Sequence, residues 1–437
     1  MRILMKSRYS AIDEKLFFLL GVLSTMQVLS VCGITLFTLI LYITFIYILL
    51  SSRRFIIADK MVVIYLLFIG VSVSSSIIFS SVSSGYASRV IKTFINISIM
   101  LLVYLLSSNN SMRCKKFLQG FVLSCKVQLY YCLIQIVCIN FLNIDINNLI
   151  FTRMFNMTTY QTQQKNGRIV CTGLHWHSAN LIPILLYLYL FSKSWLTKAL
   201  CILVAFVSQN TTAIITLGFC IIIDISVKLI KYLKQRNKRI DSKKVLITLI
   251  GVVIMCVMAE RIMPYVIEKI SGLIYRFTAL SGDLKGGEGD VGISSLTHLN
   301  YYRNMFKIMY ESSPINIILG YGLDSSGYIY SIVFKQYENV VWVIESDIVN
   351  IAINIGIVGF IIYYWLVVRI MILAIKKRMS YKYVVLVLAV IMGGITYNIQ
   401  FTWVLLLELV IYSIMKAEQF NENRIFNKGE EHYEENK

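Results

Sequence analysis

Residues that could do chemistry collect in two parts of this chain. The first is the stretch RIVCTGLHWHSANLIPILL, residues 168–186, in which an arginine, two histidines and an asparagine precede or begin an apolar run. The second is the segment 260–346, which mixes arginines with carboxylates and ends just before Asp347. Guanidinium groups bind phosphate oxygens in a two-point geometry, and carboxylates accept protons. Together these residue types suit a site that holds a phosphate and moves a proton.

Long apolar runs must position these residues. The chain has 437 residues, is 57% hydrophobic, and contains uninterrupted runs such as GITLFTLILYITFIYILL at residues 33–50. About 20 apolar residues in a row can cross a bilayer as a helix. The runs lack the alternation of polar and apolar residues that is typical of a membrane β-barrel. The sequence therefore predicts an all-α integral membrane protein.

The hydropathy pattern predicts about twelve transmembrane helices. They lie at 16–31, 33–50, 61–80, 90–106, 117–142, 175–191, 195–208, 211–230, 245–259, 347–374, 383–398 and 399–415. The expected organisation is a transmembrane domain at 1–259 with spans one to nine, an extracytoplasmic loop at 260–346, a transmembrane domain at 347–416 with spans ten to twelve, and an acidic cytoplasmic tail at 417–437. A structureless connection as long as 260–346 is uncommon, so we expect this large loop to be helical.

The positive charge of the chain predicts how these spans are oriented. The net charge is +19, and most lysines and arginines lie in every second connection, for example at 53–60, 113–116, 228–244 and 376–382. Basic connections stay on the cytoplasmic side of a membrane. Both termini are therefore expected in the cytoplasm, and the two polar regions are expected outside. The charge is interpreted as a topology signal, and nucleic acid is not expected as a partner.

No metal or cofactor is expected. The nine cysteines are scattered, mostly within the predicted spans, and show neither a CxxC pair nor a zinc spacing. His175 and His177 are two residues apart and would point to different sides of a helix, which disfavours a metal pair. Inside the spans, ionisable groups are sparse; Lys126, Asp224 and Glu408 are among them. Asp224 lies near a predicted cytoplasmic end, where it can reach water.

Three stretches share a pattern of polar residues and glycines near the starts of spans. In the first, Arg168, Gly173 and Asn180 occur in that order, and the second is the polar turn SQNTTAIITLGF at 208–219. The third includes Tyr302, Pro314, Gly320, Gly322, Glu345 and the GIVG turn at 356–359. Together they resemble the O-antigen polymerase and O-antigen ligase superfamily. These are integral membrane enzymes that join lipid-linked sugar chains outside the cytoplasmic membrane.

The resemblance implies a bacterial polymerase of the inner, or cytoplasmic, membrane. It would join polyprenyl-pyrophosphate-linked oligosaccharide repeat units into O-antigen or capsular polysaccharide, without a cofactor. Its expected partners are these lipid-linked glycans and membrane lipids, together with a flippase and a chain-length regulator. The related ligases usually have a histidine where this chain has Glu345. Glu345 therefore favours a polymerase over a ligase.

The resemblance also assigns roles to the polar residues. The expected ligands of the pyrophosphate are Arg168, Arg276, Arg303 and Arg261. The candidate catalytic bases, which would accept the proton of the sugar hydroxyl, are Glu345, Asp347 and His298. The residues expected to contact the substrate sugars are His175, His177, Asn180 and Tyr302.

Two other functions stay open at this point. A ligase would transfer the finished glycan to a lipid core, and a flippase or carrier of lipid-linked oligosaccharides would catalyse no reaction. The long outward loop disfavours the carrier, and no pair of glycine- or proline-broken spans stands out in matching halves of the sequence. Several residues also have structural alternatives, since Asn180 and Glu345 could simply cap helices and the tyrosines could anchor the chain at the membrane interface.

Overall fold

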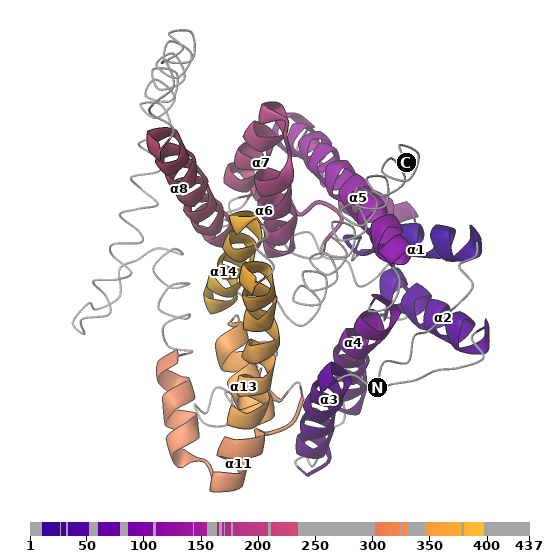
Figure 1. Cartoon of the computed structure of the whole chain (residues 1–437), viewed down its shortest axis with the longest axis vertical. Coiled ribbons are helices and arrows are strands. Elements are labelled where there is room, and N and C mark those ends of the chain that lie inside the picture. The colour runs from indigo at the N-terminus through magenta and orange to yellow at the C-terminus, as the bar shows by residue number, and fades with distance from the viewer. Residues whose placement is uncertain are drawn as a thin grey trace, which may run out of the picture.

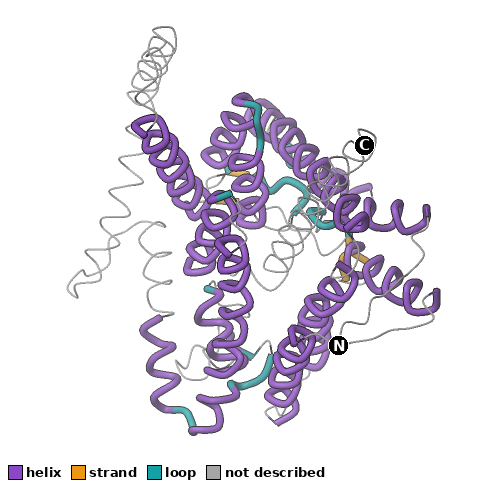
Figure 2. The backbone as a smooth tube through the Cα atoms, in the orientation of Figure 1, coloured by secondary structure: helices purple, strands orange, loops and turns teal. Residues whose placement is uncertain are grey.

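The computed structural model describes a chain that is mostly helical (Figure 2). The described residues are 11–26, 28–31, 34–51, 60–78, 86–107, 111–142, 144–154, 164–165, 168–169, 171–175, 178–208, 211–234, 302–323, 325–327, 329, 346–376 and 380–396. The predicted spans at 245–259 and 399–415, most of the loop 260–346 and the tail 417–437 lie outside them.

The first half of the chain forms helices that follow the apolar runs (Figure 1). They are α1 (Ala11–Leu23), α2 (Leu36–Ser51), α3 (Lys60–Ile78), α4 (Tyr86–Ser107) and α5 (Ser111–Val137). Between α1 and α2, the short strands β1 (Ser30–Val31) and β2 (Ile34–Thr35) pair antiparallel. The predicted spans 16–31 and 33–50 are thus separated by a small hairpin, and the first helix starts and ends earlier than expected.

Irregular segments connect α5 to the next helices. Two short π-helical segments (η1, Cys138–Leu142, and η2, Asn148–Met154) and an antiparallel pair of strands (β3, Gln164–Lys165, and β4, Arg168–Ile169) follow α5. A 3₁₀ turn (η3, Ser178–Leu181) then leads into α6 (Ile182–Phe191), α7 (Trp195–Val207) and α8 (Thr211–Lys234). Proline fits the first turn of a helix because its missing N–H needs no partner there, and Pro183 occupies that turn of α6.

The last described part consists of two short helices and a long hairpin. Residues 302–311 are helical, and α11 (Pro314–Leu319) follows them. The two long helices α13 (Asp347–Lys376) and α14 (Tyr381–Thr396) pack against each other. The structure breaks α13 at Gly356, whose φ of 63° and ψ of −170° are not helical. The sequence predicted an uninterrupted span at 347–374, so this break is a difference from the expectation.

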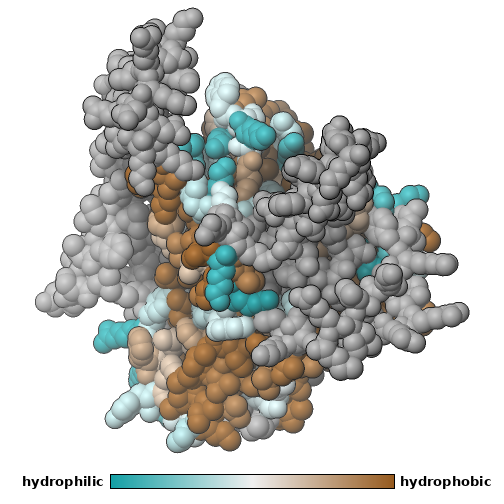
Figure 3. Space-filling view, in the orientation of Figure 1, coloured by the Kyte–Doolittle hydropathy of each residue, from teal (hydrophilic) through white to brown (hydrophobic). Residues whose placement is uncertain are grey.

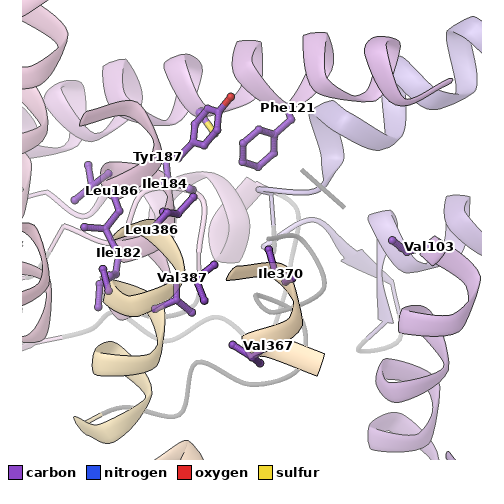
Figure 4. Close-up of a cluster of buried hydrophobic side chains, with 14 of the residues drawn as sticks. Val103, Phe121, Ile182, Ile184, Leu186, Tyr187, Val367, Ile370, Leu386 and Val387 are labelled. Atoms are coloured by element: carbon purple, nitrogen blue, oxygen red, sulfur yellow. The ribbon is translucent and has the colours of Figure 1, made fainter. Parts of the chain in front are cut away.

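The buried core lies around α6, which packs against α5, α7, α8 and α14. Every residue from Leu181 to Leu190 is buried. Figure 4 shows Ile182, Ile184 and Tyr187 of α6 near Leu386 and Val387 of α14, with Phe121 of α5 beside Tyr187. The Phe121 and Tyr187 rings meet edge to face, with centroids 5.0 Å apart. A helix that is apolar on all sides is expected to be surrounded by protein or lipid, and α6 is surrounded by helices.

Helices α1 and α5 cross with their backbones in close contact, and a glycine of each helix lies at the crossing. A Cβ atom at Gly21 would lie 2.1 Å from the carbonyl oxygen of Phe117, and one at Gly120 would lie 2.1 Å from that of Phe18. Near the same crossing, the Arg113 Nη2 atom lies 2.6 Å from Asp13 Oδ2, and both side chains are buried. Glycines allow this close backbone contact because they have no side chain to separate the helices.

The outer surface of many helices is apolar. Large aliphatic side chains such as Leu50, Ile77, Ile222 and Ile361 are exposed, and Figure 3 shows a broad hydrophobic area over the lower half of the molecule. Two helices, Met112–Val137 and Asp347–Lys376, are long and apolar enough to cross a membrane by length and composition. The prediction of a mostly helical fold is confirmed for the described residues, and these two helices weakly support membrane association. The number of spans and their orientation stay predictions.

Candidate functional site

Tyr302 and Asp347, two of the residues singled out by the sequence, both lie beside Ser346 at the start of α13. The Tyr302 hydroxyl donates a hydrogen bond to the carbonyl oxygen of Ile395 at 2.6 Å and lies 2.9 Å from Ser346 Oγ. A tyrosine hydroxyl has one hydrogen, and a carbonyl can only accept. The Ser346 hydroxyl must therefore donate to Tyr302. These bonds join the helix at 302–311 to the outer ends of both α13 and α14, as the predicted topology defines them.

Ser346 also caps α13. Its Oγ atom accepts from the backbone N–H of Val349 at 3.5 Å, which is the usual cap-to-third-residue arrangement at a long distance. The sequence left open that Glu345 caps this helix. Ser346 occupies the cap position, so α13 does not need Glu345 as its cap. Glu345 itself lies outside the described residues.

Asp347 is buried in the first turn of α13. Its residue is 5% exposed, and a Cβ atom at Gly394 of α14 would lie 3.1 Å from its Oδ2 atom. Gly394 thus leaves the space that the carboxylate occupies. A negative charge is favoured at this place because the amino end of a helix has a partial positive charge. Burial raises the pKa of the nearby Tyr302, the hydrogen bond with Ser346 lowers it, and the charge of Asp347 raises it, for a net increase.

Arg303 lies next to this group but faces away from it. Its side chain is exposed, whereas Tyr302 is half-buried against α13 and α14. Consecutive residues of a helix point in different directions, and residues four apart share a face. Arg303 therefore shares its face with Lys307, which is also exposed and lies 3.9 Å from Glu311 across the next turn. The expected pyrophosphate ligand is available to an anion outside the protein core.

Two asparagines of α13 continue the polar face of Asp347. The Asn354 Oδ1 atom accepts from the backbone N–H groups of Ser325, at 3.0 Å, and Ser326, at 2.8 Å. Its Nδ2 atom donates to Asn350 Oδ1 at 3.0 Å, and the Ser326 hydroxyl bonds to the same oxygen. Residues 347, 350 and 354 lie on one side of a helix. We call Asn350 and Asn354 the α13 amide clamp, because they hold the segment 320–326.

The backbone of the same segment closes the break in α13. The N–H of Tyr321 donates to the carbonyl of Ile353 and that of Gly322 to the carbonyl of Asn354, both at 2.9 Å. The Asn354 carbonyl also accepts from Ser75 Oγ of α3 at 3.2 Å. Carbonyls freed by a helix break must find new donors when they are buried. Here the segment 320–322 and α3 supply them.

The second polar region is held by amide side chains of α5 and of Asn147, the residue just before η2. Gln135 Oε1 accepts from the backbone N–H groups of Thr172, at 3.2 Å, and Gly173, at 2.9 Å. Gln128 Oε1 accepts from Leu174 N at 2.9 Å, and Asn147 Nδ2 donates to the Gly173 carbonyl at 2.6 Å. We call Gln128 and Gln135 the α5 amide clamp. It fixes the irregular chain that precedes η3 and α6.

The sequence-predicted residues of this region have different surroundings. His175 is fully buried, so its ring lies within the protein and not on its surface. Asn180 is half-buried in η3. Arg168 pairs through its backbone with Lys165 in the small sheet, and its side chain lies outside the described residues. The expected sugar contacts of His175 and Asn180 stay predictions.

Several predicted site residues lie outside the part of the chain that the structure describes. They are Arg261, Arg276, His298, Glu345 and His177. Within the described ranges, no group of three or more histidines, cysteines or acidic residues could hold a metal ion. The cysteines described there are all free. The proposed placement of the other arginines and of the base is therefore argued from the sequence alone.

The amides were not predicted from the sequence. Charged residues mark a polar group inside a predicted span, whereas Gln128, Gln135, Asn350 and Asn354 are uncharged and lie inside apolar runs. A signal was present, because Gln128 and Gln135 are seven residues apart and Asn350 and Asn354 are four apart, so each pair shares one face of a helix. A polar side chain within a span needs a partner. Two amide side chains at helical spacing within an apolar run therefore indicate that they bind another segment of the chain.

Comparisons with known proteins add no family assignment. The chain matches no protein family model and no curated protein. The resemblance to the O-antigen polymerase and ligase superfamily thus depends on the three motifs and the hydropathy of the sequence.

Proposed function

We propose that this chain is an integral membrane glycosyltransferase that polymerises lipid-linked oligosaccharides. In this proposal about twelve helices cross the bacterial cytoplasmic membrane, the loop 260–346 lies outside and both termini lie in the cytoplasm. The observation that favours it most is the group Tyr302, Ser346 and Asp347 at the start of α13. Arg303 follows Tyr302 in the chain and is exposed on another face of the same helix. A hydroxyl pair, a carboxylate and a guanidinium group are the residue types that a sugar-phosphate substrate requires.

The orientation is supported by the basic residues of the helix hairpins. The chain runs from Asp347 to Lys376 in α13 and returns from Tyr381 in α14 to Ile395 beside Tyr302. Lys376 and Lys382 are therefore at the end of this hairpin opposite to Asp347. Positive charge is retained on the cytoplasmic side. The group at the start of α13 is then on the outer side, where lipid-linked repeat units are joined.

The proposed reaction transfers a glycan between two lipid carriers. A sugar hydroxyl of the acceptor attacks the anomeric carbon of the donor glycan, and a new carbon–oxygen bond forms. The bond from that carbon to the pyrophosphate oxygen breaks, and its electron pair leaves with the polyprenyl pyrophosphate. The hydroxyl proton passes to a carboxylate that acts as the general base. No oxidant, nucleotide or further energy source is needed, since the donor bond supplies the driving force.

The residues divide into those that stabilise charge and those that move the proton. Arg303, with Arg168, Arg276 and Arg261, is assigned to the pyrophosphate, because planar guanidinium groups match the charge that develops on its oxygens. Glu345 is assigned as the base. It directly precedes the cap of α13, whereas Asp347 is buried in the first turn against Gly394. Asp347 is therefore the second choice, and His298 the third.

A carrier of lipid-linked glycans is the second candidate, and one observation favours it. Helices that are broken within the membrane are frequent at the binding sites of transporters, and α13 is broken at Gly356. However, the carbonyls of Ile353 and Asn354 at the break accept hydrogen bonds from Tyr321 and Gly322. A break occupied by the protein's own backbone is less suited to bind a passing substrate. We therefore rank the carrier below the polymerase.

A gene deletion followed by a glycan ladder gel distinguishes the candidates. We expect the deletion strain to attach only single repeat units to the cell surface, and the wild-type gene to restore the ladder. Long polymer that stays unattached would instead indicate a ligase. Repeat units that accumulate inside the cell would indicate a flippase, and an unchanged ladder would exclude all three functions.

A further inference from the structure

The buried carboxylate of Asp224 joins α7, α8 and α14 near Lys198 and Lys228. Asp224 of α8 is 1% exposed in its side chain. Its Oδ2 atom lies 2.6 Å from Lys228 Nζ, one turn along α8, and 3.9 Å from Lys198 Nζ of α7. Its Oδ1 atom accepts a hydrogen bond from the Tyr381 hydroxyl of α14 at 2.6 Å. Both oxygens of Asp224 thus have partners within the protein.

Aromatic rings at the end of α6 position two of the surrounding lysines. Lys198 Nζ lies 5.0 Å from the centroid of the Tyr189 ring, and Lys382 Nζ lies 5.9 Å from that of Phe191. Both distances are in the range of cation–π contacts. Lys198 and Lys382 are also close enough to each other for their charges to interact. The cluster of Lys198, Lys228 and Lys382 therefore draws on α7, α8 and α14 and rests against α6.

The lysine cluster has more positive charge than its carboxylate can neutralise. Lys228 and Lys198 face Asp224, and Lys382 lies close enough to Lys198 for their charges to interact. The three lysines therefore exceed this one carboxylate by about two positive charges. Lys228 is 62% exposed and Lys198 20% exposed in their side chains. Like charges held near one another repel, and a bound anion relieves that repulsion. The exposed Lys228 and the partly exposed Lys198 and Lys382 can reach such an anion while Asp224 holds α7, α8 and α14 together.

The surroundings of the lysine cluster are those of a membrane interface. Trp195, at the start of α7, is 78% exposed, and the adjacent Leu196 is 52% exposed. Tryptophan is enriched where lipid headgroups meet acyl chains. Basic pockets between helices on the cytoplasmic side are suited to lipid headgroups. A ligand here would have a phosphate for the lysines and an acyl chain for the apolar surface beside them.

We propose that Lys198, Lys228 and Lys382 bind the phosphate of an anionic phospholipid headgroup at the cytoplasmic end of α7, α8 and α14. The lipid occupies the surface between these helices, with its chains next to Trp195 and Leu196. This site depends on the membrane location of the protein and not on the polymerase reaction. It lies at the end of the hairpin opposite to the proposed catalytic group, so lipid binding can be measured without activity.

The test measures lipid binding to the purified full chain. After exchange into a mild detergent, phosphatidylglycerol or phosphatidylcholine is added, and bound lipid is counted by native mass spectrometry. We expect the wild type to prefer phosphatidylglycerol, and the double variant Lys198→Ala/Lys382→Ala to bind it about 30-fold more weakly, at about a tenfold loss or less per lysine. Lys193→Ala is the matched control, since it removes an exposed lysine from the nearby connection between α6 and α7, and it should bind like the wild type.

A single-lysine variant and inorganic phosphate provide two further tests of the lipid site. Lys382 packs over Phe191, so Lys382→Ala alone leaves the ion pairs of Asp224 in place and can replace the double variant if that protein does not fold. Equal binding of both lipids by the wild type, or unchanged preference in the lysine variants, would overturn the proposal. Inorganic phosphate is added in a separate experiment without lipid. If it stabilises the wild type against heat as strongly as phosphatidylglycerol does, the cluster binds a soluble phosphate and the lipid assignment is wrong.

Discussion

Two parts of the molecule hold a glycine-containing segment with amide side chains, and they do so differently. In the α5 amide clamp, Gln128 and Gln135 bind the backbone of Thr172, Gly173 and Leu174 from a continuous helix. In the α13 amide clamp, Asn354 binds the backbone of Ser325 and Ser326 from a helix that is itself broken two residues later. Both segments contain glycine at positive φ.

The difference is in which groups make the contact. α5 is a continuous helix, and the hydrogen bonds that it makes to the backbone of the segment 172–174 come from its side chains. α13 gives up backbone bonds at Gly356, and its carbonyls bind the segment 320–322 directly. Side chains can move to relieve a clash, whereas two backbones in contact cannot move without disturbing the elements that contain them. The contact at α13 should therefore tolerate substitution less well than the contact at α5.

The largest effect is expected for Gly356→Ala. A Cβ atom there would lie 2.4 Å from the Ile318 carbonyl oxygen and 2.5 Å from Gly320 N, and the φ of 63° is unfavourable for alanine. We expect a loss of stability of about 3 kcal/mol or more. Thermal unfolding of the purified protein in detergent measures it. Gly218→Ala in α8 is the control because a Cβ there meets nothing within 4 Å; equal stability of the two variants would contradict the tight backbone contact.

An intermediate effect is expected when an amide becomes a carboxyl group. Asn354 Nδ2 donates to Asn350 Oδ1, and Asn354→Asp places an oxygen where that donor was. Gln135 Nε2 has no hydrogen-bond partner among the described residues, so Gln135→Glu replaces a nitrogen that bonds to none of them. Both variants keep an oxygen for the two backbone N–H groups. We expect Asn354→Asp to be less stable than Gln135→Glu by about 1–2 kcal/mol; the reverse order would show that the clamps are not held as described.

A smaller effect than that of Gly356→Ala is expected for Gly173→Ala. Its φ of 60° is also unfavourable for alanine, but a Cβ atom would meet only side chains, Gln128 Oε1 and Leu181 Cδ2, both at 2.8 Å. These ends can shift by rotation. We expect a loss of about 1–2 kcal/mol, mainly from the left-handed backbone conformation. A loss as large as that of Gly356→Ala, in the same thermal unfolding assay, would remove the distinction between the two clamps.

Local sequence patterns predicted the helices and missed the contacts that interrupt them. The expected spans at 195–208 and 383–398 correspond to α7 and α14, because continuous apolar runs bounded by polar residues define both. The span expected at 175–191 begins as a helix only at Ile182. The chain before it is fixed by Gln135, which is 38 residues away from Gly173. The break at Gly356 likewise requires the segment 320–322. Both interruptions depend on residues far away in the chain, and the apolar pattern that predicts the spans does not reveal them.

The candidate site was predicted in part. The sequence singled out Tyr302, Arg303 and Asp347 through residue type and the family resemblance, and the structure brings Tyr302 to the start of α13 and the end of α14. The role of Ser346 as cap and hydrogen-bond donor was not predicted, since serine next to two carboxylates has no distinct sequence signal. The amides were not predicted because glutamine and asparagine within an apolar run have no charge that distinguishes them.

The central claim is that Glu345 accepts the proton of the acceptor hydroxyl in a polymerase, and the most direct test is Glu345→Gln in a strain that lacks the wild-type gene. Because Ser346 caps α13, the variant should reach normal abundance in the membrane. A neutral amide cannot accept the proton, so polymerisation should slow on the order of 10²–10⁴-fold, and the glycan ladder gel should show single repeat units only. Glu345→His should restore part of the ladder, since imidazole can accept the same proton. A full ladder from Glu345→Gln at normal protein abundance would contradict the assignment.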